Sequence, residues 1–212
     1  MNTRPVPHLH IATTLLALTA GCIWPSMGAA RDAYEFGAFA GYRFSGHLRD
    51  ETTDETLKLG TSGSYGAVLD IPYDANGQLE LIWSHSREPL GPETLFAGAP
   101  RFDVDVDYFH IGGIHNLDGG RVKPFVAGGF GVTRLVPKQS GLSSATEFSV
   151  ALGGGAKVWL TRHLGLRLEG RGFLSLTDTS GSLFCGNNGC VARINGSGFG
   201  QFEVSAGVFA AF

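Results

Sequence analysis

Several features of common protein classes are missing from this sequence. No apolar run is long enough to cross a bilayer as a helix: the uncharged run Ile11–Ile23 has 13 residues, whereas a membrane helix needs about 20. The net charge is −3, so no basic surface favours a nucleic-acid partner. Glycine clusters such as 153–155 lack the Gly-Lys-Ser/Thr of a phosphate-binding loop, and we expect no cofactor. Beyond the N-terminal run, no stretch shows convincing helical periodicity.

The N-terminus has the pattern of a secretory signal peptide. Arg4 supplies a positive charge, the run Ile11–Ile23 follows, and Gly28-Ala29-Ala30 is a small-x-small cleavage site. We therefore expect residues 1–30 to be removed and residues 31–212 to form one mature domain. Cys22 leaves an alternative open, because the preceding residues resemble a lipobox in which this cysteine would be lipidated.

Cysteine is scarce, with three residues in the chain. Cys185 and Cys190 are separated by four residues, and export places them in an oxidising compartment. A zinc site needs more ligands, and a redox motif has two residues between its cysteines. The pair Cys185–Cys190 is therefore predicted to form a disulfide bond.

The mature chain shows a repeated alternation of period two, which indicates β-strands with two different faces. In most segments one face is apolar and the other carries glycine or charge, as in a membrane barrel whose strands separate lipid from a lumen. The 32 glycines fit a narrow lumen that needs small residues. The sequence predicts an all-β, eight-stranded antiparallel transmembrane β-barrel with strands near 34–45, 62–71, 78–86, 102–115, 122–133, 147–160, 165–176 and 198–212.

Loop lengths support this prediction. Short connections alternate with long polar ones, as at the periplasmic and extracellular ends of outer-membrane barrels. A soluble β-sandwich or β-barrel is the alternative, but it would place the apolar faces inside and the charges in water. A charge on the lipid face at the midplane would cost about 2–4 kcal/mol, so the charged faces are expected to line the lumen.

The fourth segment, 102–115, is oriented by the same reasoning. Val104, Val106 and Tyr108 are expected to face lipid, and Asp103, Asp105 and Asp107 the lumen. The alternation then blurs at 109–111, where we expect a bulge. The aspartate row could hold a cation, although pairing with lumenal Arg or Lys is the simpler expectation.

Charged residues on the predicted lumen face must pair, since an unpaired buried charge is strongly unfavourable. They are expected to form a network that closes the barrel, with a narrow ion path as the alternative. The predicted members are Glu35, Arg43, Asp70, Glu80, Asp105, Lys157, Arg167, Glu169, Arg171 and Glu203.

Four stretches resemble the small bacterial outer-membrane β-barrel family that includes OmpX and the OmpA membrane domain: 36–44, 121–131, 166–171 and the terminal aromatic Phe212. The resemblance covers the whole mature chain. It implies residence in the outer membrane among lipid and lipopolysaccharide, and insertion by the barrel-assembly machinery, with Phe212 as the C-terminal assembly signal. Members are mostly structural, adhesive or ligand-binding proteins.

The expected function is therefore a structural, adhesive or ligand-binding role through long extracellular loops, which could contact a ligand or a cell surface. A lipid A-modifying enzyme is the main alternative. It would need a Ser and a His on one strand face, but His85 points away from Ser84 and Ser86. We expect no enzyme, although a dyad across two strands stays open. The acidic loop 50–55 matches no calcium motif, so we expect no metal site there.

Overall fold

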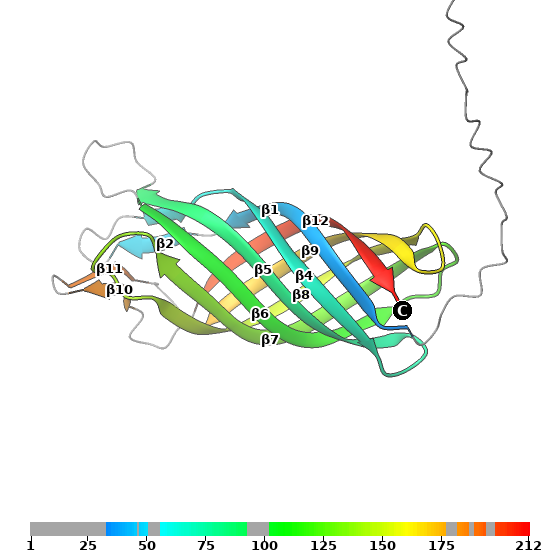
Figure 1. Ribbon diagram of the computed structural model, residues 1–212. Coiled ribbons are helices and arrows are strands. Elements are labelled where there is room, and N and C mark those ends of the chain that lie inside the picture. The colour runs from blue at the N-terminus through cyan, green and yellow to red at the C-terminus, as the bar shows by residue number, and fades with distance from the viewer. Residues whose placement is uncertain are drawn as a thin grey trace, which may run out of the picture.

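The structure is a computed structural model of a closed β-barrel (Figure 1). It describes residues 33–45, 47–50, 56–92, 102–176, 182–186, 189–193 and 198–212. For 47–50, 56–59, 91–92, 182–186 and 189–193, only the backbone is described. The predicted signal peptide, Cys22 and residues 51–55 of the acidic loop 50–55 lie outside the described residues. No described helix is long and apolar enough to cross a membrane.

Eight long strands form the barrel, as predicted, and each pairs antiparallel with both neighbours. Strand β1 pairs with β12 over the full length of β1, and the pairing of β5 with β6 completes the ring. Around the barrel the order is β1-β4-β5-β6-β7-β8-β9-β12. The eight strands are β1 (Glu35–Ser45), β4 (Ser62–Pro72), β5 (Gly77–Pro92), β6 (Phe102–Asn116), β7 (Val122–Pro137), β8 (Ala145–Trp159), β9 (Leu164–Leu176) and β12 (Phe199–Ala211).

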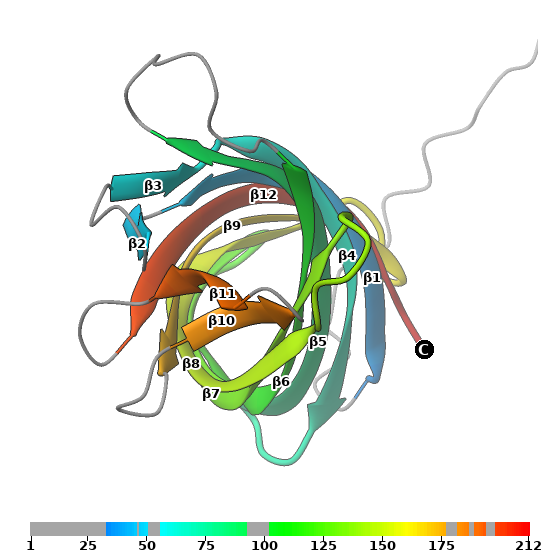
Figure 2. The ribbon, with the colours of Figure 1, turned by 90° about the vertical axis from the view of Figure 1, so that its left-hand side faces the viewer.

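Four short strands lie beyond the barrel wall, at the end opposite the C-terminus (Figure 1). They are β2 (His47–Asp50), β3 (Thr56–Leu59), β10 (Ser182–Gly186) and β11 (Gly189–Arg193). The hairpin β10–β11 pairs with β2, β2 pairs with β3, and β3 pairs with β5, so the four strands extend the barrel sheet. Figure 2 looks onto this end and shows β10 and β11 in front of the barrel opening. Cys185 and Cys190 are direct partners in the hairpin, but their side chains lie outside the described residues, so the disulfide stays a prediction.

The opposite end carries short turns and both ends of the barrel chain, which identifies it as the periplasmic end. Tyr34 N donates to Phe212 O over 3.1 Å beside these turns. The β4–β5 turn is closed by Asp74, whose Oδ1 accepts from the backbone N–H groups of Asn76 and Gly77. These two hydrogen bonds hold the pKa of Asp74 below its usual range, because they favour the carboxylate. The local polar contacts keep the turn tight.

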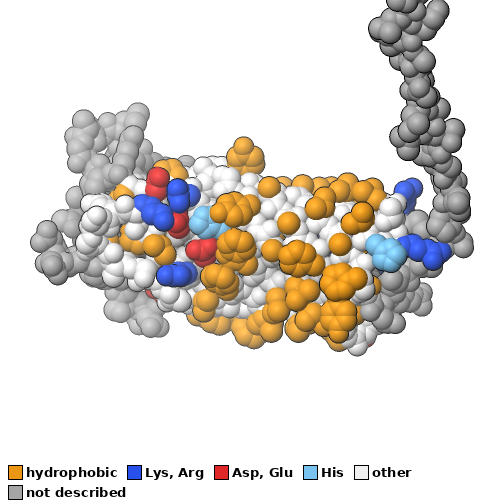
Figure 3. Space-filling view, viewed as in Figure 1, with side chains coloured by type: hydrophobic (Ala, Val, Ile, Leu, Met, Phe, Trp, Pro, Cys, Tyr) orange, Lys and Arg blue, Asp and Glu red, His pale blue; other side chains and the backbone are white. Residues whose placement is uncertain are grey.

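Exposed apolar side chains lie on the outer face of all eight barrel strands and form a belt, one side of which is seen in Figure 3. The belt side chains are exposed in the isolated chain; Leu152, for example, is 76% exposed. Charged side chains of the same strands are buried inside instead, so the belt needs an apolar surrounding such as lipid. The belt includes Phe36, Leu81, Trp83, Phe109, Ile111, Val126, Phe130, Leu152, Leu166, Leu168, Val204 and Val208.

The orientation predicted for β6 was wrong. Val104, Val106 and Tyr108 are fully buried inside the barrel, and the aspartate row 103–107 lies on the outer face. Asp105 pairs there with Arg87 and Lys138. The reason is that a period of two sets alternation but not which face is inside. The extracellular part of β6 lies beyond the belt, so charges are tolerated on its outer face, while its inward side chains Val104, Val106 and Tyr108 pack in a hydrophobic cluster inside the lumen.

The bulge predicted in β6 was also wrong. Its pairing with β5 and β7 continues without a skipped residue through Phe109, His110 and Ile111. The pattern only looked irregular because its first half had been assigned to the wrong face. With even-numbered residues inside, the strand alternates from Phe102 to Ile111.

A glycine substitution tests how closely the strands approach one another. A Cβ added at Gly155 would lie 1.9 Å from Leu168 O, whereas one added at Gly63 would meet nothing within 4 Å. We expect Gly155→Ala to destabilise the barrel by about 1–3 kcal/mol, because the backbone must shift. Urea unfolding in detergent micelles measures the change, and Gly63→Ala is the control. Equal unfolding midpoints for the two variants would contradict the strand spacing described here.

Candidate functional site

The interior of the barrel holds most of its buried charges, in two layers. The layer nearer the periplasm is centred on Lys157, which is 1% exposed. Its Nζ lies 2.7 Å from Glu35 Oε2, 2.8 Å from Asp70 Oδ2 and 2.8 Å from Gln78 Oε1. Gln78 also donates to Glu35 over 2.8 Å. One ammonium group from β8 therefore holds together polar side chains of β1, β4 and β5.

Two arginines of β9 continue this layer toward the middle of the barrel. Arg167 donates to Asp70 over 3.0 Å and to Glu169 over 2.9 Å, and it also contacts Glu80. Arg171 donates to Glu80 over 2.6 Å and to Glu169 over 2.7 Å. Each guanidinium group thus bridges carboxylates of different strands, which compensates for removing these charges from water.

The second layer lies nearer the extracellular end and is centred on Arg43. Its Nη2 is 2.8 Å from Glu203 Oε2, and its Nη1 donates to Ser86 Oγ over 2.6 Å. Ser84 contacts both Arg43 and Glu203. Glu88 has no direct cation partner in the described part of the chain and accepts instead from neutral donors, Ser45, Ser86 and Gln201.

An aromatic and aliphatic cluster fills the lumen around this second layer. The rings of Tyr108 and Phe173 stack with their centroids 4.1 Å apart, and the Arg43 guanidinium lies 4.8 Å from the Tyr108 centroid. Such a cation–π contact stabilises a charge that has lost its water. The buried cluster comprises Leu90, Val104, Val106, Tyr108, Leu135, Ala151, Phe173 and Phe199.

A cavity of about 630 Å³ opens at the periplasmic end. The three short turns and Trp159 form its walls, and its lining reaches Glu35, Gln78 and Lys157. The Lys157 layer is therefore the inner limit of the space that the periplasmic mouth offers.

Comparisons with known proteins found the same architecture in solved structures. Neisserial surface protein A matches with a TM-score of 0.61 and 14% identity, over 84% of this chain and 97% of that one. The outer-membrane protein OprG of Pseudomonas aeruginosa matches with a TM-score of 0.56 and 12% identity, over 86% and 97%. AlkL, an outer-membrane protein solved in lipid bilayers, matches with a TM-score of 0.52 and 14% identity, over 89% and 93%. No family model and no curated protein sequence matches.

This chain has the fold of a small outer-membrane β-barrel. The predicted resemblance to the OmpX and OmpA membrane-domain type is therefore confirmed at the level of the fold. Together with the apolar belt, the fold places the protein in the bacterial outer membrane.

Nine of the ten residues predicted for the lumen network lie inside this outer-membrane barrel, in the two layers described above. The exception is Asp105. Its Oδ1 lies 2.8 Å from Arg87 Nε on the outer face of the barrel, where Lys138 is its second partner. The aspartate row therefore does not line the lumen mouth, and no described group of three acidic, His or Cys side chains could hold a metal ion.

Sequence reasoning missed several polar residues of the interior. Glu88 was missed because the third segment was ended at Ser86, although the inward alternation Glu80, Ser84, Ser86 continues to Glu88. Pro89 concealed this continuation because proline is uncommon inside strands. Gln78 and Gln201 carry no charge, so a search for lumen charges did not select them.

Two contacts bear on the enzyme alternative. His110 Nε2 lies 2.7 Å from Ser149 Oγ, but both side chains are buried inside the barrel, and His110 Nδ1 has no partner in the described structure. On the outer face, His85 Nδ1 lies 2.8 Å from Asp107 Oδ1. Its outward strand neighbours on the same face are Tyr65, Trp83 and Arg87, and none of these is a serine.

Removing the central lysine tests the Lys157 layer. Lys157→Met keeps the length of the side chain but leaves Glu35 and Asp70 without their shared cation. We expect the free energy of unfolding to fall by about 3–5 kcal/mol, since one partner of a buried ion pair is lost. Urea unfolding in micelles measures it.

The control is Lys123→Met, because Lys123 is partly exposed and lies 5.9 Å from the Trp159 ring centroid. Its loss is expected to change stability by about 1 kcal/mol or less. If both variants unfold at the same urea concentration, Lys157 does not organise the interior.

Proposed function

We propose that this outer-membrane barrel is a non-enzymatic scaffold that holds extracellular segments for adhesion or ligand capture. The observation that carries the proposal is the pairing between two long connections. Ala192 and Arg193 of β11 pair with Asp50 and Arg49 of β2, which joins the β9–β12 connection to the β1–β4 connection. Through β3, the joined strands are anchored to β5 of the barrel wall.

Such an arrangement favours binding because the extracellular strands lose their conformational entropy when the protein folds and not when a partner binds. A free loop loses conformational entropy when it orders on a partner, which weakens the complex. Strands β2, β3, β10 and β11 are held by backbone hydrogen bonds before any partner arrives. A ligand or another cell surface would therefore meet a partly ordered platform at the mouth of the barrel (Figure 2).

The filled interior favours this role over that of an ion-conducting pore. Eight strands leave a lumen that side chains just fill. Here the Lys157 layer fills the lumen toward the periplasm, and the Arg43 layer with the stacked rings of Tyr108 and Phe173 fills it toward the extracellular end. An ion would have to break several of these buried contacts to pass.

The geometry of the histidines favours a non-enzymatic scaffold over a lipid A-modifying enzyme. Hydrolysis by a serine needs a His in contact with it, an orienting carboxylate and access to the substrate. The His110–Ser149 pair lacks access from lipid, and the His85–Asp107 pair lacks a serine. Unchanged lipid A masses in cells expressing the protein would agree with a non-enzymatic role.

Conductance measurements test the closed lumen. Purified barrel is added to a planar lipid bilayer, after a gel without boiling has shown a faster, folded band. We expect no single-channel current steps above those of a protein-free detergent control, because both ion-pair layers stay intact. Reproducible steps of constant size would overturn the closed-scaffold proposal in favour of a pore.

Replacing the hairpin tests the platform. Residues 182–193 are exchanged for a short Gly-Ser linker, and adhesion of expressing cells to epithelial monolayers and to sister cells is counted. We expect adhesion to fall to the level of cells with an empty vector, because the cross-connection pairing is lost. Ala192→Ser, which keeps the backbone ladder, is the control and should adhere like the parent. If the hairpin replacement also adheres like the parent at equal surface amounts, the platform is not the binding element.

A further inference from the structure

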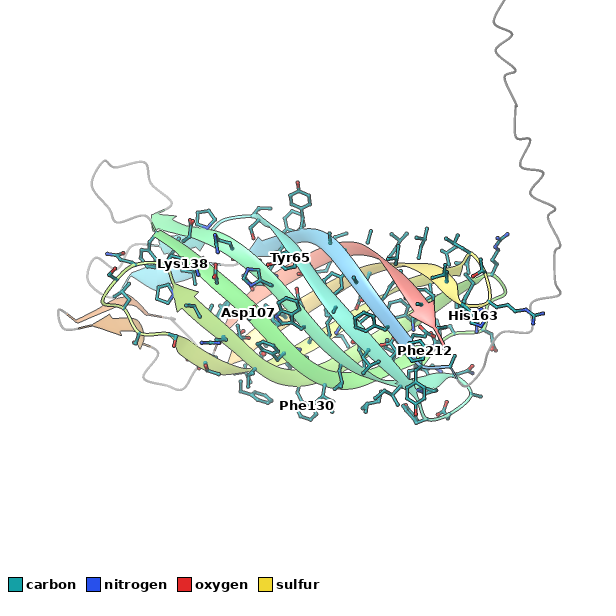
Figure 4. The ribbon with its side chains drawn as sticks, viewed as in Figure 1. Tyr65, Asp107, Phe130, Lys138, His163 and Phe212 are labelled. Carbon is teal, nitrogen blue, oxygen red and sulfur yellow. The ribbon has the colours of Figure 1, made fainter. Side chains whose placement is uncertain are left out.

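A charged region on the outer wall lies apart from the interior network and from the hairpin. It lies on β5 to β7, on the extracellular side of the apolar belt (Figure 3). Figure 4 labels two of its members, Asp107 and Lys138, on the face that also carries Tyr65. We call it the outer polar patch; it consists of His85, Arg87, Asp103, Asp105, Asp107, Arg134 and Lys138.

The patch starts where the belt ends. On β5 the outward side chain before His85 is Trp83, and on β6 the outward side chain next to Asp107 is Phe109. Trp83 Nε1 donates to Asp107 Oδ1 over 3.2 Å, and the rings of Tyr65 and Trp83 meet edge to face with centroids 5.9 Å apart. Tyr and Trp with one apolar and one polar side typify the headgroup level of a membrane. The patch therefore lies at the headgroup level of the outer leaflet.

Among the side chains that the structure describes, the outward charges at this level lie on one side of the barrel. At the extracellular ends of the other five barrel strands, the described outward side chains are uncharged. They are Phe44 on β1, Tyr65 on β4, Thr146 on β8, Leu176 on β9 and Phe202 on β12. If the charges served only to keep the rim in water, they would be spread around the whole circumference.

Asp105 holds two cations of the patch in place, and these cations keep hydrogen-bond donors that Asp105 does not use. Asp105 Oδ1 accepts a hydrogen bond from Arg87 Nε over 2.8 Å, and Asp105 Oδ2 forms an ion pair with Lys138 Nζ. The Arg87 side chain is 58% exposed and that of Lys138 44%, and the η nitrogens of Arg87 have no partner among the described residues. Arg134 is exposed opposite Asp107 and forms no ion pair within the described structure. The patch therefore offers three cations with free donors, two of which are oriented by Asp105.

We propose that the outer polar patch binds the phosphorylated glucosamine headgroup of lipid A in the outer leaflet. Phosphate oxygens accept paired hydrogen bonds from guanidinium groups, which suits Arg87 and Arg134, and Lys138 supplies a point charge. The acyl chains would lie along the belt below the patch, beside Trp83 and Phe109. A lipid with this shape matches the free cationic donors of the patch and the place of the patch above an apolar wall.

Lipid A titration tests the proposal. The folded barrel in zwitterionic detergent micelles is titrated with bisphosphorylated lipid A, and the tryptophan fluorescence is followed, because Trp83 lies next to the patch. The triple variant Arg87→Gln, Arg134→Gln, Lys138→Gln removes three charge-assisted contacts, so we expect its affinity to be lower by roughly a hundredfold. A gel without boiling checks that the variant is still a folded barrel.

Two controls make the result specific. The periplasmic variant Lys123→Gln, Arg162→Gln also loses positive charge and is expected to bind lipid A like the parent. Dephosphorylated lipid A with the same acyl chains is expected to bind the parent as weakly as lipid A binds the triple variant. Equal affinity of the parent and the triple variant for lipid A would overturn the proposal. So would equal binding of phosphatidylglycerol, which would reduce the patch to a general anion attractor.

Discussion

The constraint on which this structure depends is that a charged side chain cannot face the hydrocarbon of a membrane. A charge at the bilayer midplane costs about 2–4 kcal/mol on the outside of a barrel. The charges of the spanning strands therefore lie inside, where Lys157 and Arg167 each join carboxylates from different strands and Arg43 joins Glu203 to Ser84 and Ser86. The same contacts that satisfy buried charge also tie the eight strands together across the lumen.

A narrow barrel then limits how the interior can be filled. Strand pairs approach so closely at Gly155 that even a methyl group would meet backbone atoms of β9. Small inward residues on β8 leave room for the long arginines of β9, which reach across to β4 and β5. Size and charge are thus distributed together: glycine on one strand accommodates a guanidinium group on the next. The result is a barrel whose lumen is filled by side chains, which is why the proposed function lies in the extracellular connections.

On the extracellular side of the belt, charged side chains no longer have to avoid the outer face of the barrel, so they are distributed differently between the two faces of a strand. The inner face of β6 becomes apolar at Val104, Val106 and Tyr108, while its outer face becomes acidic. Water and headgroups outside can solvate the aspartates, whereas the lumen at this level is filled by the rings of Tyr108 and Phe173. This exchange produces the outer polar patch and explains why an orientation valid for the spanning part fails at the extracellular end.

The sequence by itself determined the number of barrel strands, their order, the alternation along them and, for nine of ten predicted charges, their place inside. These features follow from local periodicity and from the cost of charge in lipid, both of which can be read along one strand. The tertiary structure alone decided which carboxylate meets which cation, the phase of β6 and the pairing of β11 with β2. These depend on the register between strands and on the height at which the lipid ends, and neither quantity is contained in the alternation of a single strand.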